Sequence, residues 1–352
     1  AKPAQQRAAG RLSSPAVDSS GVLSLAAYGP ECTCTMAAMT RKRLLIHTAF
    51  LFVLPILVAW FGLGVLTTIA VVLLMLLWRW LIVVSGIVRP ENVPDIVLET
   101  IPVSHYVEKV RWSMDRLGID YVERAHGGTL GAYFTGRSVP QLRVRTYIVQ
   151  SVIGNSAEIL RYLWGNYAAT RAKEAAFLEP TAERLELEQR LDRYGRYLQV
   201  WIWHHILHDR GLTLHLWGVH DPNVPGWQRR ALRILFPLLK ALIRKSFRLT
   251  DEHYAKAVHF IDDVLGDVDT RLSDGRLSIL GGDTINYTDI AFAALSGPWL
   301  RPRGYGGGMA DDCRIERDEA PAGMRKDIDR WSEDYPKATA FIERMYADER
   351  FR

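Results

Sequence analysis

The sequence predicts an α/β domain followed by an all-α domain, with a long apolar tract before both. Between residues 96 and 163, short apolar strands alternate with helix starts. Beyond residue 165, apolar residues recur at helical spacing. From residue 44 to 88 the chain is almost continuously apolar, with Arg79 as its single formal charge. Helices are expected at 183–208, 226–247 and 251–272.

Composition sets limits on the class of protein. A chain of 352 residues with 48 % apolar residues has room for two modest domains and extra elements. A net charge of +5 is mild and favours anionic lipid as a partner; no nucleic-acid motif appears. Three cysteines are too few for a disulfide framework and fit a reducing compartment. His204 and His208 lie one helical turn apart, but no carboxylate has matching spacing on a second helix, so no metal is expected.

The apolar tract predicts a transmembrane anchor at residues 41–89. A membrane helix needs about 20 apolar residues, so the tract accommodates two, at 44–61 and 65–84, with a turn at Gly62–Gly64. The basic residues 41–43 favour the cytosolic side, and a hairpin returns the following domain to that side. One tilted helix is the alternative. Residues 1–40 are expected to be a disordered or targeting segment, with Met39 as a candidate start.

The first candidate site residue is Ser104. It lies where the strand beginning at Ile96 passes into an amphipathic helix that ends near Gly118. The first amides of a helix have no partner within the helix and form the positive end of its dipole. A hydroxyl beside these amides can stabilise a thiolate. A capped helix without chemistry is the alternative interpretation.

Two further features follow in order. Val139-Pro140 opens an apolar strand, since proline is confined to strand starts and edges, and a cis bond there would aim the Val139 backbone at a ligand. Asn155 and Ser156 open another helix, whose free amides make an anion site. An edge strand and an ordinary N-cap are the alternatives. Three such features in this order predict a site for one small anionic thiol.

Two later helices carry other signals. The segment 226–247 is basic and amphipathic, so it is either a helix that lies against anionic headgroups or a core helix with a solvated face. Asn286, followed three residues later by Asp289, predicts a capping box at a helix start. The capping box is a folding feature with no chemical role.

Several of these segments resemble glutathione S-transferases. Val103–Asp115 with Gly118–Tyr121 is similar to their first helix, and Val139-Pro140 resembles their cis-proline corner. The resemblance covers roughly residues 95 to 352. Three further stretches resemble the γ-glutamyl-binding helix start, the capping motif of the helical domain and the last helix of the family, namely Gly154–Leu163, Leu280–Ala291 and Tyr335–Tyr346.

The resemblance implies a thioredoxin-like domain at 95–165, an all-α domain at 175–352 and glutathione as co-substrate. Ser104 would then face the sulfur, the Val139 backbone at Pro140 would pair with the cysteinyl part, and Asn155 with Ser156 would hold the γ-glutamyl end. Two positions depart from the family pattern. Val107 stands where many relatives carry cysteine, which excludes disulfide exchange there, and Asn155 replaces the usual acid.

The expected function is therefore a membrane-anchored, cytosol-facing transferase that conjugates glutathione to apolar electrophiles through a thiolate stabilised by Ser104. Tyr106, Tyr194, Trp201 and the loop after Pro298 are the candidates for contact with the electrophile. The resemblance also implies a homodimer. A non-catalytic scaffold of the same fold and a glutathione-dependent isomerase are the alternatives.

Overall fold

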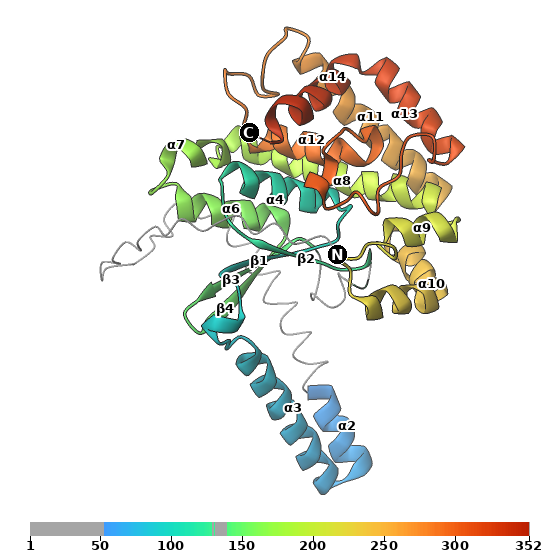
Figure 1. Ribbon diagram of the computed structural model, residues 1–352. Helices are drawn as coiled ribbons and strands as arrows, with labels where there is room; N and C mark the ends of the chain where they lie inside the picture. The colour runs from blue at the N-terminus through green and yellow to red at the C-terminus, as the bar shows by residue number, and fades with distance from the viewer. Residues whose placement is uncertain (1–52, 129, 131–138, 352) are drawn as a thin grey trace. The chain divides into compact units, whose positions relative to one another are not determined.

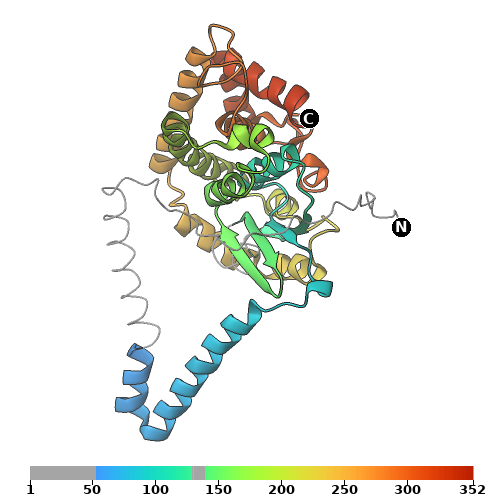
Figure 2. The same cartoon turned by 90° about the vertical axis from the view of Figure 1, so that its left-hand side faces the viewer.

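The computed structural model describes residues 53–128, 130 and 139–351, and the chain divides into two compact units, residues 1–84 and 85–352. The described part of the first unit consists of α2 (Leu54–Leu63) and most of α3 (Val65–Ser85). Figure 2 shows these two helices as the arms of a V. Gly64 joins them at φ 86°, a backbone conformation that favours glycine.

The helix expected at 65–84 is confirmed as α3. The first part of the helix expected at 44–61, like the segment 1–40, lies outside the described residues. Within the part of the chain that the structure describes, no helix combines the length and the apolar character needed to cross a membrane. The transmembrane hairpin expected from the sequence is therefore not supported.

The second unit contains one four-stranded mixed sheet with the order β2-β1-β3-β4. The central strand β1 pairs in parallel with β2 and antiparallel with β3, and β3 pairs antiparallel with β4. Tyr147 and Ile148 connect β3 to β4 as a tight hairpin. The strands are β1 (Ile96–Thr100), β2 (Val122–Ala125), β3 (Gln141–Thr146) and β4 (Val149–Gly154).

Two helices, α4 (His105–Arg116) and α6 (Ser156–Tyr167), lie together on one side of the sheet (Figure 1). Leu98 and Leu142 are register partners on β1 and β3, so their side chains share this face and join the core with Ile159. Gly118 ends the first helix with φ 60°, as a C-terminal glycine does. The predicted α/β domain is confirmed.

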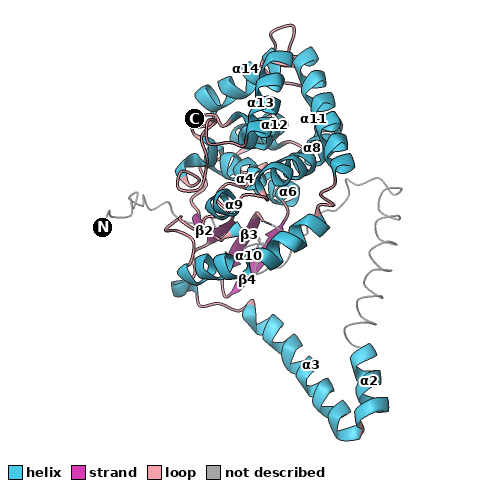
Figure 3. Ribbon diagram, turned by 90° about the vertical axis from the view of Figure 1, so that its right-hand side faces the viewer, coloured by secondary structure: helices cyan, strands magenta, loops and turns pink. Residues whose placement is uncertain are grey.

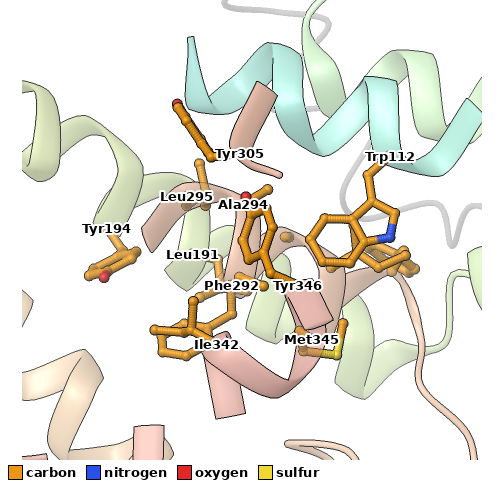
Figure 4. Close-up of a cluster of buried hydrophobic side chains, with 14 of the residues drawn as sticks. Trp112, Leu191, Tyr194, Phe292, Ala294, Leu295, Tyr305, Ile342, Met345 and Tyr346 are labelled. Carbon is orange, nitrogen blue, oxygen red and sulfur yellow. The ribbon is translucent and has the colours of Figure 1, made fainter. Parts of the chain in front are cut away.

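The remaining helices form the all-α part, and α12 lies at its centre. Almost every residue of α12 is buried, and its side chains pack against α4 and α8 in the core that Figure 4 shows. The helices predicted at 183–208, 226–247 and 251–272 are confirmed as α8, α10 and α11. The bounds are α7 (Ala172–Ala175), α8 (Ala182–Ile206), α9 (Arg210–Leu216), α10 (Gly226–Ser246), α11 (Asp251–Arg271), α12 (Tyr287–Leu300), α13 (Ala322–Asp334) and α14 (Pro336–Arg344).

A second, smaller core lies beneath α10. Its inward residues pack on Trp217 and on Leu207, which follows α8. Figures 1 and 3 both show α9 and α10 beside the strands, away from α13 and α14. The inward residues of α10 in this core are Leu232, Phe236, Leu239 and Ile243.

Candidate functional site

The strand register brings the three predicted features to one edge of the sheet. Glu99 near the end of β1 is paired with Gln141 at the start of β3, and Gln141 is paired with Gly154 at the end of β4. Because this row crosses three strands, the segments just beyond it lie along one edge. Those segments carry Ser104, Val139-Pro140 and Asn155-Ser156, as the sequence order predicted.

Ser104 is the N-cap residue of α4, with extended backbone angles of φ −74° and ψ 122°. Its carbonyl oxygen accepts the first helical hydrogen bond from the N–H of Glu108 at 2.9 Å. Its side chain makes no capping hydrogen bond, and the residue is half-buried. Among the residues that the structure describes, the hydroxyl therefore has no hydrogen-bond partner, and it lies at the positive end of the helix in the wall of a cavity.

Val139 precedes Pro140 in a cis peptide bond, which confirms the predicted geometry. Val139 is half-buried and lines the same cavity as Ser104, whereas Pro140 is buried directly before β3. The structure therefore brings Ser104 and Val139 together at one cavity.

Asn155 and Ser156 begin α6 as expected. Asn155 has φ 72°, and its Oδ1 accepts a hydrogen bond from the N–H of Ala157 at 3.2 Å. Ser156 is only 2 % exposed, and its hydroxyl has no hydrogen-bond partner within the described part of the chain. Such a group is costly to bury, by about 1–3 kcal/mol, so this hydroxyl has bonding capacity available to a ligand. Neither residue lines the cavity beside Ser104.

The cavity has a volume of about 380 Å³ and lies between the sheet edge and the helices. Its wall is mainly apolar, and α8 contributes Gln199, Ile202 and Ile206 at helical spacing. Other apolar walls come from Ile101, Val103, Leu216, Trp217, Phe247, Pro298, Tyr305, Ile315 and Met324.

His105 follows Ser104 and also lines the cavity. Burial lowers the pKa of His105 to about 4, because the low-dielectric surroundings disfavour the imidazolium. The ring is therefore neutral near pH 7. Its Nε2 lies 3.2 Å from the carbonyl oxygen of Gly195, which only accepts, so the proton is on Nε2. His105 ties the start of α4 to α8.

Arg301 places a guanidinium in the cavity wall. It ends α12 with φ 54°, and it donates to the carbonyl oxygen of Glu316 at 3.4 Å and to Sδ of Met324 at 3.2 Å. Burial lowers the pKa of Arg301 to about 10, so it stays charged at neutral pH. The nearby Arg314 is paired with Glu316 at 3.0 Å.

The three residues proposed to contact the electrophile lie elsewhere. Tyr106 is half-buried against α8, and its hydroxyl donates to the carbonyl oxygen of Asp192 at 2.9 Å. Tyr194 is fully buried in the core, bonded to Ser296 Oγ at 2.9 Å, and Figure 4 shows it within that cluster. Trp201 is also buried and donates from Nε1 to Asp327 at 2.8 Å. None of the three lines the cavity, which is bounded by the neighbouring face of α8.

The loop after Pro298, expected beside the electrophile, lines the cavity through Arg301, Pro302 and Tyr305. Trp217 and Phe247 also line it, and no sequence pattern singled them out. Trp217 and Phe247 come from the segment around α9 and α10, and only tertiary packing brings that segment to the sheet edge. The backbone N–H of Gly127, after β2, donates to Gln228 of α10 at 2.8 Å and shows where the segment meets the edge.

The two histidines near the end of α8 contact a cluster around Tyr254 and Asp327. His205 Nε2 lies 3.3 Å from Oδ2 of Asp327, and Tyr254 donates to the same oxygen at 2.8 Å. His204 stacks on the ring of Tyr254 with centroids 3.9 Å apart. Among the residues that the structure describes, no group of three or more His, Cys, Asp or Glu side chains is arranged to hold a metal ion.

Neither a family model nor a curated protein sequence matches this chain. Solved structures of low sequence identity do match. One is a glutathione S-transferase of Methylobacterium radiotolerans in complex with glutathione sulfonate. It is 14 % identical to this chain, the match covers 73 % of this chain and 92 % of that chain, and the TM-score is 0.42. The protein FzlA of C. crescentus has 14 % identity, with 74 % and 91 % covered and a TM-score of 0.41.

A glutathione S-transferase of Methylobacillus flagellatus with bound glutathione has 13 % identity, with 73 % of this chain and 96 % of that chain covered and a TM-score of 0.43.

Proposed function

We propose that this protein is a glutathione transferase that joins the tripeptide's sulfur to an apolar electrophile. One observation carries the proposal: an uncommitted hydroxyl, that of Ser104, lies at the start of α4 in the wall of an apolar cavity. The thiol of glutathione binds over this helix start, where the hydroxyl and the free amides favour its ionised form.

The rest of the tripeptide follows the sheet edge. The backbone of Val139 pairs with the cysteinyl part. Asn155 and Ser156 hold the γ-glutamyl end, and the unpaired buried hydroxyl of Ser156 supports this placement. The acid of the family pattern is absent, so Asn155 offers the γ-glutamyl amine an amide oxygen in place of a carboxylate.

The reaction needs no redox partner. The thiol loses its proton to water, and Ser104 donates its O–H to the resulting thiolate. A lone pair of the sulfur then forms the new carbon–sulfur bond, while the leaving group departs from the electrophile with the bonding electron pair. Neutral His105 supplies no charge at pH 7, so stabilisation of the thiolate falls to Ser104 and the amides of α4.

The cavity favours an apolar electrophile, and Arg301 offers a cation to an acceptor that also carries an anionic group.

We propose that the protein works at a membrane, with this domain facing the cytosol. Support comes from the many exposed apolar side chains of α2 and α3, among them Phe61 and Leu66. Cell fractionation with protease treatment of sealed vesicles tests this: the domain after residue 90 should be digested while the vesicles are intact.

The catalytic proposal is tested with the full-length protein in mild detergent. We expect retention on immobilised glutathione and turnover of a chlorinated nitroaromatic acceptor. Ser104→Ala should lower kcat by at least about tenfold, with a higher pKa for the bound thiol in the pH–rate profile. The matched control is Ser332→Ala on α13, which removes the same atom from a residue that does not line the cavity.

Other outcomes contradict the proposal. Retention without turnover identifies a scaffold of the same fold, for which the departures at Val107 and Asn155 are the sequence indications. Turnover of a double-bond substrate without net loss of glutathione identifies an isomerase. No retention at all removes glutathione from the function of this protein.

A further inference from the structure

We propose that the outward face of α10, together with a basic hollow at its C-terminal end, binds the headgroups of an anionic lipid surface. The outward face is defined by Ile234, Leu235, Leu238 and Leu242. The basic hollow is defined by Arg244, Lys245, Arg248 and Lys256. This inference does not depend on glutathione binding, and it concerns a surface separate from the cavity beside Ser104.

The helix has more apolar surface than its core requires. Its inward residues, from Leu232 to Ile243, already fill the small core beneath it. The outward face is a second apolar sector, in which Ile234 is 76 % exposed, Leu238 57 % and Leu242 51 %. These positions are four residues apart, so the side chains lie in one row along the helix. Large apolar side chains aligned in this way on a surface mark an interaction site.

The charge of the helix is of one sign. Between Gly226 and Ser246 the sequence contains no Asp or Glu, and its cations are Arg229, Arg230, Arg233, Lys240, Arg244 and Lys245. Arg229, Arg233, Lys240 and Arg244 follow spacings of four and seven residues, so they form a second row beside the apolar sector. Within the described part of the chain, no ion pair engages these six side chains. The row is therefore free to meet external anions.

The basic hollow lies between the end of α10 and the start of α11, with a volume of about 870 Å³. Its wall carries four cations and one carboxylate, that of Glu252. Arg248 takes φ 48° just after the helix ends, and the chain then turns into α11. The hollow suits a phosphate or carboxylate headgroup. On the helix, the exposed Leu242 lies beside the hollow and Leu238 about one turn before it.

An apolar row beside a cationic row favours a lipid surface over other partners. A helix of this kind lies in the interface with its apolar residues among the acyl chains and its cations at the headgroups. A polyanion such as RNA would use the cations and leave the leucine row in water. A second copy of this chain would place one helix with six cations against another, and these like charges would repel.

The test uses the full-length protein and vesicles of phosphatidylcholine alone or with about 30 % phosphatidylserine. The measured quantity is the ratio of the two apparent affinities, obtained by flotation at 0.1 M salt. The apolar segment 53–85 contributes to both affinities and largely cancels in the ratio. Each surface cation is worth about a fivefold change. We therefore expect Arg244→Gln/Lys245→Gln/Arg248→Gln to lower the ratio by at least about tenfold.

The matched control removes three exposed cations elsewhere, in Lys173→Gln/Lys326→Gln/Lys337→Gln, and should leave the ratio within about twofold. Ile234→Ser/Leu238→Ser should weaken binding to anionic vesicles without lowering thermal stability, since both side chains already face solvent. An unchanged ratio in the α10 triple variant, or an equal loss in the control, overturns the proposal. The proposal is also overturned if Ile234→Ser/Leu238→Ser changes the protein from dimer to monomer and leaves lipid binding intact. That result identifies a second copy of this chain as the partner of the outward face.

Discussion

The carboxylate of Asp289 accepts a hydrogen bond from the backbone N–H of Asn286 at 2.8 Å, at the start of the central helix α12. In return, Asn286 Oδ1 accepts from the N–H of Thr288 at 2.9 Å. The same carboxylate accepts from Ser278 Oγ at 2.7 Å and from the N–H of Ile279 at 2.8 Å. The predicted capping box is thus confirmed, and it also anchors the loop before α12.

Asn286→Ala should lower the free energy of unfolding by about 1–2 kcal/mol, because it removes an N-cap and leaves buried donors and acceptors unpaired. Urea denaturation of the full-length protein measures this loss. Asn166→Ala, the same change at an exposed position of α6, should have little effect. Equal denaturation midpoints for the two variants would contradict the role given to this cap.

The capping box was predictable because all its signals are local. The helix starts at Ser104 and Asn155 were predictable for the same reason, as was the order that places them at one edge. The walls of the cavity were not. On α8, Trp201 and Ile202 are adjacent in sequence, yet Trp201 points into the core and Ile202 into the cavity. The periodicity of apolar residues identifies the buried face of a helix. It does not identify which part of that face borders a cavity and which part packs against a neighbouring element.

His105 should make stability depend on pH. Its pKa in the folded protein is about 4, below its ordinary value of 6.5, because the ring is buried. The unfolded chain therefore binds more protons between pH 4 and 6.5, and the free energy of unfolding rises with pH across that window. The contribution is complete above pH 6.5 and is lost as the pH falls towards 4, by roughly 3 kcal/mol.

Urea denaturation at pH 7, 5.5 and 4.5 tests this dependence. His105→Gln keeps a donor for the carbonyl of Gly195 and removes the titration, so its stability should fall less steeply with acid. His259→Gln, at an exposed position of α11, should follow the parent protein. The assignment is wrong if the parent and His105→Gln lose stability in parallel.

A buried ion pair joins the α/β part to the helical part. Lys109 of α4 is fully buried, and its Nζ lies 3.0 Å from Oε1 of Glu188 on α8. Arg161 of α6 contacts the other oxygen of Glu188. Glu188→Gln leaves the buried Lys109 and the half-buried Arg161 without their main partner and should cost about 3–5 kcal/mol. Glu186→Gln, two residues earlier and exposed, is the matched control, and a similar small effect of both changes would show that the pair contributes little.

Ser156 offers the sharpest separation between folding and ligand binding. Its buried hydroxyl has no partner within the described residues, so Ser156→Ala should leave the free energy of unfolding unchanged or raise it by about 1 kcal/mol. If the hydroxyl bonds the charged γ-glutamyl end, the same variant should bind glutathione about tenfold more weakly, since such a bond is worth about 1.5–3 kcal/mol.

Ser113→Ala removes a buried hydroxyl that is already bonded to the carbonyl oxygen of Lys109 at 2.8 Å, and it should bind glutathione as the parent does. Calorimetric titration with reduced glutathione, beside urea denaturation, measures both quantities. Lower stability with unchanged affinity would assign Ser156 to the fold and take it out of the site.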